Sequence, residues 1–360
     1  MNQAILPRYV MRSAFFAMLL SVIGLWLLQM VFAYLSELEN LSDTYTFIDA
    51  LKFIFYRSPY FLVQFIPTGA LLGVVIGLGL LAGNSELVVM RAVGVSKYKI
   101  ISWAMIPAFL FVVLSLAVNQ FILPITNQKA LQNRDHHSHD IISIKGYWSV
   151  KQQDNATQIT YIGYADDKGQ LGQIKQYRLA DAELAHALSA NGGTYDKKNQ
   201  DDYIWKLLDI NEITINKTGV TQSYDNAQTL ALPISPTDVH LLTKDADDLS
   251  LTDLYAHKQL MTHQKLRSLR HELSFWQKLF SPFAVLSLVL VASSFVFGSL
   301  RSQGLGLRIV MALLTGLLFS YLTDLLGFVA LAINISPLVM ALLPIMISAG
   351  VGAWLLKRQP

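Results

Sequence analysis

The chain has 360 residues, of which 53% are hydrophobic and only 15% are charged. An average soluble domain is about 45–50% apolar and about 25% charged, so the composition argues against a soluble protein. The absence of cysteine excludes disulfides, thiolate-bound metals and a thiol nucleophile. The net charge is only +3 and the Lys and Arg residues are scattered, so we expect no nucleic-acid partner.

Six apolar segments are long enough to cross a membrane as helices. A hydrocarbon core of about 30 Å requires about 20 apolar residues, because every backbone polar group must be paired within the segment. The first segment is too long, and too poor in small residues, to be a removable signal peptide. The expected spans are residues 14–34, 61–82, 100–123, 279–300, 309–335 and 337–356.

Basic residues in the short connections predict the orientation, since positively charged flanks stay in the cytoplasm. They place both termini in the cytoplasm and residues 126–272 on the opposite side. The chain thus divides into spans one to three (residues 1–125), an extracytoplasmic domain (126–272) and spans four to six (273–360). The basic residues on the predicted cytoplasmic side are Arg8, Arg12, Arg91, Lys97, Lys99, Arg301, Arg308, Lys357 and Arg358.

The extracytoplasmic segment is long enough to form its own domain, and its pattern favours β-structure. Runs rich in Ile, Tyr, Trp and Thr alternate with turn signals, which predicts an antiparallel sandwich or jelly roll. Ser250 and Asp253 mark the start of an amphipathic helix over 251–269 that returns the chain to the membrane. The expected strands are 141–150, 158–164, 173–179, 203–208 and 212–216, and the expected turns are 154–155, 166–169, 191–193 and 217–219.

Few residues offer catalytic or metal-binding chemistry. No G-x-x-x-x-G-K-[ST] motif occurs, so the chain does not hold nucleotide phosphates in the P-loop manner. His136, His137, His139 and Asp140 lie too close in sequence to build a tetrahedral metal site alone, and we expect a polar linker, with no metal and no cofactor in this chain. Asp324 is the single charge within a span, and we favour a structural role, facing water or a partner helix, over proton relay.

Glycines at every fourth residue predict a helix contact in the second span. Gly69, Gly73 and Gly77 share one helix face, where a neighbouring backbone can approach closely. The spacing leaves open whether that neighbour belongs to this chain or to another.

The connection after the second span predicts a short helix near residues 85–93. Ser85 can cap it, Glu86 suits its positive N-terminal end, and Gly94 can end it in the left-handed conformation. Leu87 and Met90 would share one face, beside a Glu86 carboxylate that an arginine could bind. The pattern fits a helix resting on lipid as well as a helix docking into a partner protein.

At this connection the sequence resembles the LptF/LptG permease family, the membrane part of the lipopolysaccharide export ABC transporter of Gram-negative bacteria. The resemblance covers the whole chain, and the sequence at 85–90 is closer to the LptG branch than to the LptF branch. The motifs are Ala-Leu-Leu-Gly at 70–73, Gly-Leu-Gly at 77–79, Ser-Glu-Leu-Val-Val-Met at 85–90, Trp-Gln-Lys-Leu-Phe-Ser-Pro at 276–282, Phe-Gly-Ser-Leu-Arg-Ser at 297–302 and Ala-Leu-Leu-Pro at 341–344.

The resemblance implies a multi-pass inner-membrane permease subunit, not an enzyme, with six transmembrane helices and an inserted periplasmic β-jelly roll. It implies lipopolysaccharide as substrate, LptF as the paired permease, LptC as a receiver, and an LptB dimer that binds ATP and Mg beneath the permeases. The alternatives are the LptF subunit itself, or a lipid-modifying membrane enzyme using Asp324 and the His136 cluster, which lie on separate elements. The family's coupling helix, which contacts LptB, matches Ser85, Glu86, Leu87, Met90 and Arg91 here.

One departure from the family concerns the periplasmic end of the first helix. Family members carry lysines there to meet lipid A phosphates, whereas this chain has Glu37 and Glu39. Phosphates cannot lie against these carboxylates without a compensating cation. The candidates for head-group contact are Lys52, Arg57, Lys129 and Arg134, with Arg134 as the main contributor because a guanidinium clamps phosphate bidentately.

Overall fold

The computed structural model describes residues 5–42, 45–135, 147–153, 156–165, 170–180, 183–199, 202–216, 219–232, 235, 239–263, 268–298 and 303–358. The chain forms two compact units. The helical unit comprises Met1–Ser138, Ser250–Thr252 and Ser268–Pro360, and the β unit comprises His139–Leu249 and Asp253–Arg267.

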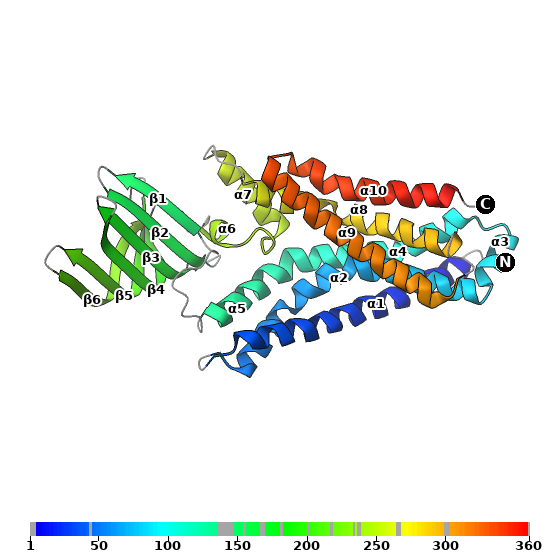
Figure 1. Ribbon diagram of the computed structural model, residues 1–360, viewed down its shortest axis with the longest axis horizontal. Helices are drawn as coiled ribbons and strands as arrows, with labels where there is room; N and C mark the ends of the chain where they lie inside the picture. Colours follow the sequence, from blue (N-terminus) through cyan, green and yellow to red (C-terminus); the bar gives the residue numbers. More distant parts are fainter. Residues whose placement is uncertain are drawn as a thin grey trace. The chain divides into compact units, whose positions relative to one another are not determined.

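The helical unit contains six helices that are long and apolar enough to cross a membrane, so the expected class, a multi-pass helical protein with an inserted β domain, is confirmed. Figure 1 shows both chain termini and the short helix α3 (Glu86–Ala92) at one end of this unit. The third span contains a π-helical turn, η2 (Val118–Ile122), between α4 (Lys97–Ala117) and α5 (Leu123–Asp135). The other spans are α1 (Ile5–Glu37), α2 (Phe47–Gly83), α8 (Leu269–Phe297), α9 (Leu305–Ile333) and α10 (Pro337–Lys357).

The helices run beyond the apolar segments that predicted them. The helix of the third span continues to Asp135, and α8 already begins at Leu269, so the expected domain boundaries near 126 and 272 fall inside helices. Hydropathy marks the membrane edge, whereas a helix continues as long as its backbone hydrogen bonds do.

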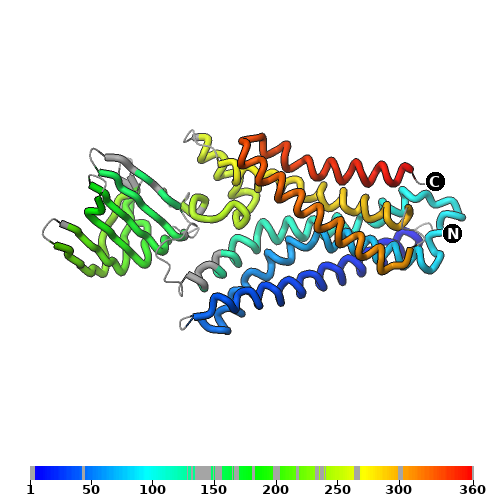
Figure 2. The backbone as a smooth tube through the Cα atoms, viewed as in Figure 1, coloured from blue at the N-terminus to red at the C-terminus, as the bar shows by residue number. Residues whose placement is uncertain are grey.

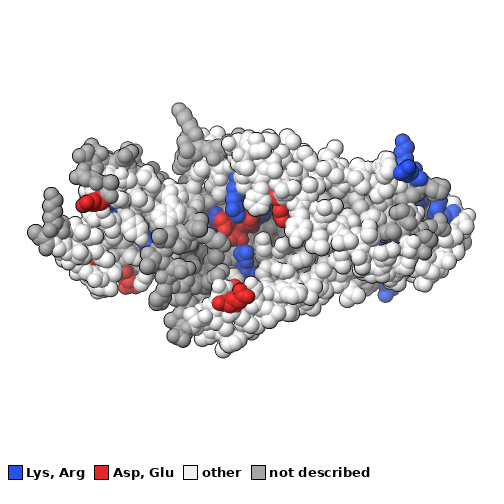
Figure 3. All heavy atoms as spheres, viewed as in Figure 1, with Lys and Arg blue, Asp and Glu red and all other residues white. Residues whose placement is uncertain are grey.

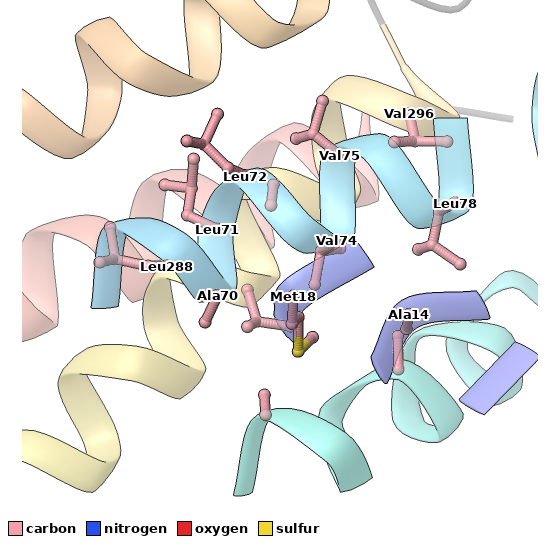
Figure 4. Close-up of a cluster of buried hydrophobic side chains, with 14 of the residues drawn as sticks. Ala14, Met18, Ala70, Leu71, Leu72, Val74, Val75, Leu78, Leu288 and Val296 are labelled. Atoms are coloured by element: carbon pink, nitrogen blue, oxygen red, sulfur yellow. The ribbon is translucent and has the colours of Figure 1, made fainter. Parts of the chain in front are cut away.

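The central helix of the unit is α2, which packs against α1, α5, α8 and α9. Its residues Ala70, Leu71, Val74, Val75 and Leu78 are fully buried. Figure 4 shows this stretch between Ala14 and Met18 of α1 and Leu288 and Val296 of α8. A helix that is apolar all round is stable only when other helices or lipid cover every face, and here other helices cover much of it.

The glycine face of α2 lies against α1 of the same chain. A Cβ built on Gly73 would lie 2.3 Å from the Cα of Met18, and one on Gly69 would lie 2.4 Å from Cγ2 of Val22. At Gly77 the Ser13 hydroxyl donates a 3.2 Å hydrogen bond to the backbone carbonyl. The two backbones therefore approach at distances that no residue with a side chain would permit.

Replacing Gly73 by leucine should push α1 away from α2, because the new side chain would overlap the backbone of Met18. We expect Gly73→Leu to destabilise the purified protein by about 1–3 kcal/mol, the usual cost of overpacking, measured as thermal unfolding in detergent. Gly24→Leu is the matched control, because a Cβ at Gly24 meets no atom within 4 Å. Equal stability of the two variants would contradict the packing.

The β unit contains a single antiparallel sheet whose six described strands pair in chain order. Trp205, Leu207 and Ile210 are fully buried in its core together with Ile162 and Ile174. After the sheet come α6 (Val239–Thr243) and α7 (Leu251–His263), and the expected helix start after Ser250 is confirmed. The strands are β1 (Tyr147–Gln153), β2 (Ala156–Ala165), β3 (Gln170–Ala180), β4 (Glu183–Asn199), β5 (Asp202–Asn216) and β6 (Gly219–Leu232).

The regular pairing of this sheet is interrupted along one row of positions, which we call the crease. In each of four successive ladders a pair is missing at this row, and the positions concerned neighbour one another across the strands. Gln173 and Asp209 adopt left-handed φ values of +52° and +54° there. The side of the strand that faces the core changes at this row. In a regular strand the residues on one face are two apart, whereas the buried Leu207 and Ile210 are three apart. Buried residues on both sides of this row belong to one core cluster. The crease comprises Gly163, Gln173, Asn191, Asp209 and Asn226.

The crease explains one wrong prediction. Residues 191–193, expected as a turn, lie inside the long strand β4, because their permissive backbone serves the crease and not a chain reversal. Two expected strands, 203–208 and 212–216, are halves of β5, while β4 and β6 were not predicted at all. Residues 154–155, 166–169, 217–218 and 141–146 of the expected turns and strands lie outside the described residues.

Candidate functional site

The connection between α2 and α4 forms the helix α3, as predicted near residues 85–93. Its end is a Schellman motif, in which the N–H of Gly94 donates to the Arg91 carbonyl (3.0 Å) and that of Val95 to the Met90 carbonyl (3.1 Å). Gly94 has φ +90°, so its predicted left-handed conformation is confirmed.

The start of α3 differs from the prediction. Ser85 occupies the N-cap position, but its φ is +62° and its side chain makes no capping hydrogen bond. A capping side chain requires an extended backbone to reach the free N–H groups of the first turn. Ser85 contributes its carbonyl instead, which accepts from the N–H groups of Val88 and Val89.

Leu87 and Met90 share one face of α3, as predicted, and this face turns toward the core of the chain. Leu87 and Met90 are each only 4% exposed and belong to the core cluster of the helical unit. They therefore anchor α3 to its own chain. The apolar side chains that remain accessible are Val88, Val89 and Val93, at 46%, 62% and 62% exposed.

The acidic residue of α3 has a hydrogen-bond donor in its own chain. The Glu86 carboxylate accepts a hydrogen bond from the Asn84 side-chain amide (3.4 Å). Glu86 is half-buried, and Arg91 on the last turn of α3 is exposed. The surface of α3 thus combines an oriented carboxylate with exposed valines.

Other chain segments meet at the same end of the helical unit. The Lys97 ammonium, at the start of α4, donates a 3.0 Å hydrogen bond to the Leu356 carbonyl in the last turn of α10, a C-terminal helix contact that also suits the helix dipole. Figure 2 shows the two termini close to α3 at this end. On the face drawn in Figure 3, Lys and Arg gather there, while much of the adjoining helical surface is uncharged.

The head-group candidates lie on two neighbouring helices, α2 and α5. Lys52 pairs with Asp49 at 3.2 Å and remains 55% exposed, and the Arg57 guanidinium lies 4.6 Å from the ring centre of Tyr60. Lys129 is exposed on α5. Arg134 lies on the last turn of α5, with its side chain outside the described residues.

Two contacts hold α5 against the first part of α2. The Asn133 amide donates a 2.9 Å hydrogen bond to the Asp49 carbonyl, and Ala130 is buried in a cluster with Phe53 and Ile54. All four candidate positions therefore belong to a single packed pair of helices.

Glu37 turns into the protein, at the end of α1 where the family carries lysines. Its side chain is 7% exposed and accepts a 3.2 Å hydrogen bond from the Tyr45 hydroxyl. Glu39 is exposed. Of the two carboxylates expected to repel a phosphate, only Glu39 faces outward.

The remaining candidates form no reactive site in the described part of the chain. Asp324 is exposed on α9, and one turn later Gly327 packs against Leu273 of α8. The cluster of His136, His137, His139 and Asp140 lies outside the described residues. Among the residues that the structure describes, no group of three His, Asp or Glu side chains could hold a metal ion.

Six membrane-length helices, a short exposed helix at a basic end and an inserted β domain define a multi-pass membrane protein of the permease type. The family model described as "Lipopolysaccharide export system permease LptF/LptG" matches residues 8–358, and the chain belongs to this family. The similarity recognised from the motifs is thereby confirmed.

Named relatives extend over the full length of the chain. The lipopolysaccharide export system permease protein LptG of Haemophilus influenzae is 30% identical over 362 aligned positions, covering 98% of each chain. The LptG protein of Escherichia coli K12 is 27% identical over 361 positions, covering 99% of this chain and 98% of the relative.

A substitution by aspartate should have different effects on the two faces of α3. Val89→Asp should leave folding unchanged, because Val89 is 62% exposed, and should weaken any protein that docks on α3. Leu87→Asp should destabilise the chain itself by about 3 kcal/mol or more, since it places a carboxylate in the apolar core. Thermal unfolding of the two purified variants separates these effects, and equal melting temperatures would contradict the observed anchoring.

Proposed function

We propose that this chain is the LptG-type permease subunit that extracts lipopolysaccharide from the inner membrane and passes it to a periplasmic bridge toward the outer membrane. The observation that carries the proposal is similarity to LptG proteins over 98% or more of the chain. The motif at 85–90, which supports LptG over the paralogous LptF, forms the exposed helix α3.

The proposed complex contains LptF as the second permease, an LptB dimer that hydrolyses ATP with Mg, and LptC as receiver. A separate ATPase is required because the chain has no P-loop sequence. A second permease would cover apolar side chains that α1 and α9 leave accessible, such as Phe32, which is 59% exposed, and Phe328, which is 72% exposed. A lipid-modifying enzyme receives no support from a match to a permease family.

The proposed orientation puts α3 and both termini in the cytoplasm and the β unit in the periplasm. It is supported by the Lys and Arg side chains at the α3 end of the helical unit, because positively charged flanks remain in the cytoplasm. The same orientation gives α3 access to a cytoplasmic ATPase.

In this proposal α3 transmits movement of the ATPase to the spans. Leu87 and Met90 fix α3 to the core that α2 shares with α1 and α8. A close-packed core transmits displacement because it has few voids to absorb it. Movement of LptB would therefore reach α2 and, through the glycine face, α1.

Glu86 is the residue we expect to bind an LptB arginine, so Glu86→Ala tests the proposed function. Loss of one partner from a desolvated ion pair leaves the other charge stranded, at a cost of about 2–5 kcal/mol in binding. We expect weaker co-purification of LptB, or ATPase activity uncoupled from lipopolysaccharide release. Glu183→Ala, at an exposed glutamate on β4, is the control. Normal assembly and export by Glu86→Ala would refute the assignment.

Lys129 and Arg134 are proposed as lipid A phosphate contacts, assisted by Lys52 and Arg57. The double change Lys129→Ala and Arg134→Ala should reduce photocrosslinking to lipopolysaccharide severalfold while LptB remains bound. The matched control is Lys357→Ala with Arg358→Ala at the opposite end of the unit. Unchanged crosslinking in the first pair, together with a change on reversing the charge of Glu39, would place the head group at α1 instead.

A further inference from the structure

The third span changes its helical geometry at the turn η2 (Val118–Ile122). The N–H of Leu123 donates to the carbonyl of Val118, five residues earlier, where an α-helix would pair residues four apart. Pro124 accounts for the change, because proline has no N–H to donate and its ring clashes with the carbonyl four residues before it, which is that of Gln120. Single π-helical turns of this kind are rare and often lie at functional sites.

The side chains of this turn make two different hydrogen bonds. The amide of Asn119 donates to the carbonyl of Ser115 on the preceding turn of the same helix (3.2 Å). The amide of Gln120 donates outside its helix, to the hydroxyl of Thr252, which lies 132 residues later in the sequence (2.7 Å). The Thr252 hydroxyl in turn lies 2.9 Å from that of Ser250. Gln120 therefore joins the third span to a distant segment of the chain.

The segment that Gln120 contacts is the start of α7. Thr252 is the second residue of α7, and Ser250, which directly precedes this helix, is only 2% exposed. Ser250–Thr252 belongs to the helical unit, whereas the chain before it, up to Leu249, and after it, from Asp253, belongs to the β unit. The bond thus lies within the helical unit, at the point where the chain of the β unit enters it.

The connectivity of the chain does not require this contact. The next span, α8, begins only at Leu269, so the backbone could continue from the β unit to α8 with Thr252 away from the third span. A neutral hydrogen bond between accessible groups shifts a local equilibrium by only about threefold to tenfold. The contact therefore adds little to the stability of the fold, but it can open and close reversibly, as a contact that transmits movement must.

We propose that Gln120 is a positioning residue that ties the start of α7 to the third span and transmits movement of this span to the segment that carries the β unit. The inference rests on the proposed function, in which LptB moves the spans through α3. The third span is well placed for this role, because α4 follows α3 in sequence and its residues Ile100 and Ala104 share the core cluster that holds α3.

The test uses the full permease complex, purified with LptB, and compares two neighbouring amides. Gln120→Ala removes the bond to Thr252, whereas Asn119→Ala, the matched control, removes only the bond within the helix. In Gln120→Ala we expect hydrogen–deuterium exchange of residues 250–256 to rise about threefold to tenfold, as for the loss of one neutral hydrogen bond. Lipopolysaccharide release per ATP hydrolysed should fall by a similar factor. Asn119→Ala should match the wild type in both measurements.

Removing the other partner shows whether Gln120 acts through Thr252. Thr252→Val keeps the shape of the side chain without its hydroxyl, so it should reproduce the effects of Gln120→Ala, and the double variant should be no worse than either single variant. Unchanged exchange or unchanged release in Gln120→Ala, additive losses in the double variant, or equal losses in Asn119→Ala would each overturn the role of Gln120. A wild-type complex that releases no lipopolysaccharide would instead overturn the proposed function.

Discussion

Close contact between the backbones of α1 and α2 is the constraint on which the helical unit depends. Gly73 lets the backbone of Met18 approach to a distance that excludes any side chain, and the same face continues at Gly69 and Gly77. Helices in lipid gain little from the hydrophobic effect between themselves, so such close packing has to supply much of their association. With α1 in place, α2 can be covered by α1 and α8 along its buried stretch.

The position of α3 follows from that core. A seven-residue helix is too short to be stable by itself, and α3 is held by its buried leucine and methionine and by a Schellman end. These anchors leave Glu86 and three valines accessible at the basic end of the unit. A partner bound there would act on a helix that joins α2 to α4 and packs into the core that α1, α2 and α4 share.

The sequence was most informative where a single physical requirement dominates. Long apolar segments predicted the six spans because lipid tolerates few alternatives to a helix, and the spacing of Gly69, Gly73 and Gly77 predicted a close helix contact. Gly94 was predictable because few residues adopt its backbone conformation.

Other features of the structure could not be predicted, because no local sequence pattern determines them. Residues 87–90 are all apolar, so their pattern could not show which side chains face the core. At the crease, Gln173 carries no turn signal, whereas Asn191 lies in an Asn-Gly-Gly sequence that is typical of a turn. The hydrogen bond from Lys97 to the Leu356 carbonyl joins residues far apart in sequence, and no local pattern indicates it.

The central claim is that the exposed face of α3 is a cytoplasmic docking surface for the ATPase. The chain has no cysteine, so Val89→Cys provides a unique label site on that face and Tyr224→Cys, at a residue of β6 that is 76% exposed, provides one on the β unit. We expect a membrane-impermeant maleimide to label Val89→Cys only from the cytoplasmic side and only in the absence of bound LptB, and to label Tyr224→Cys only from the periplasmic side. Labelling of Val89→Cys from the periplasm, or equal labelling with and without LptB, would contradict the claim.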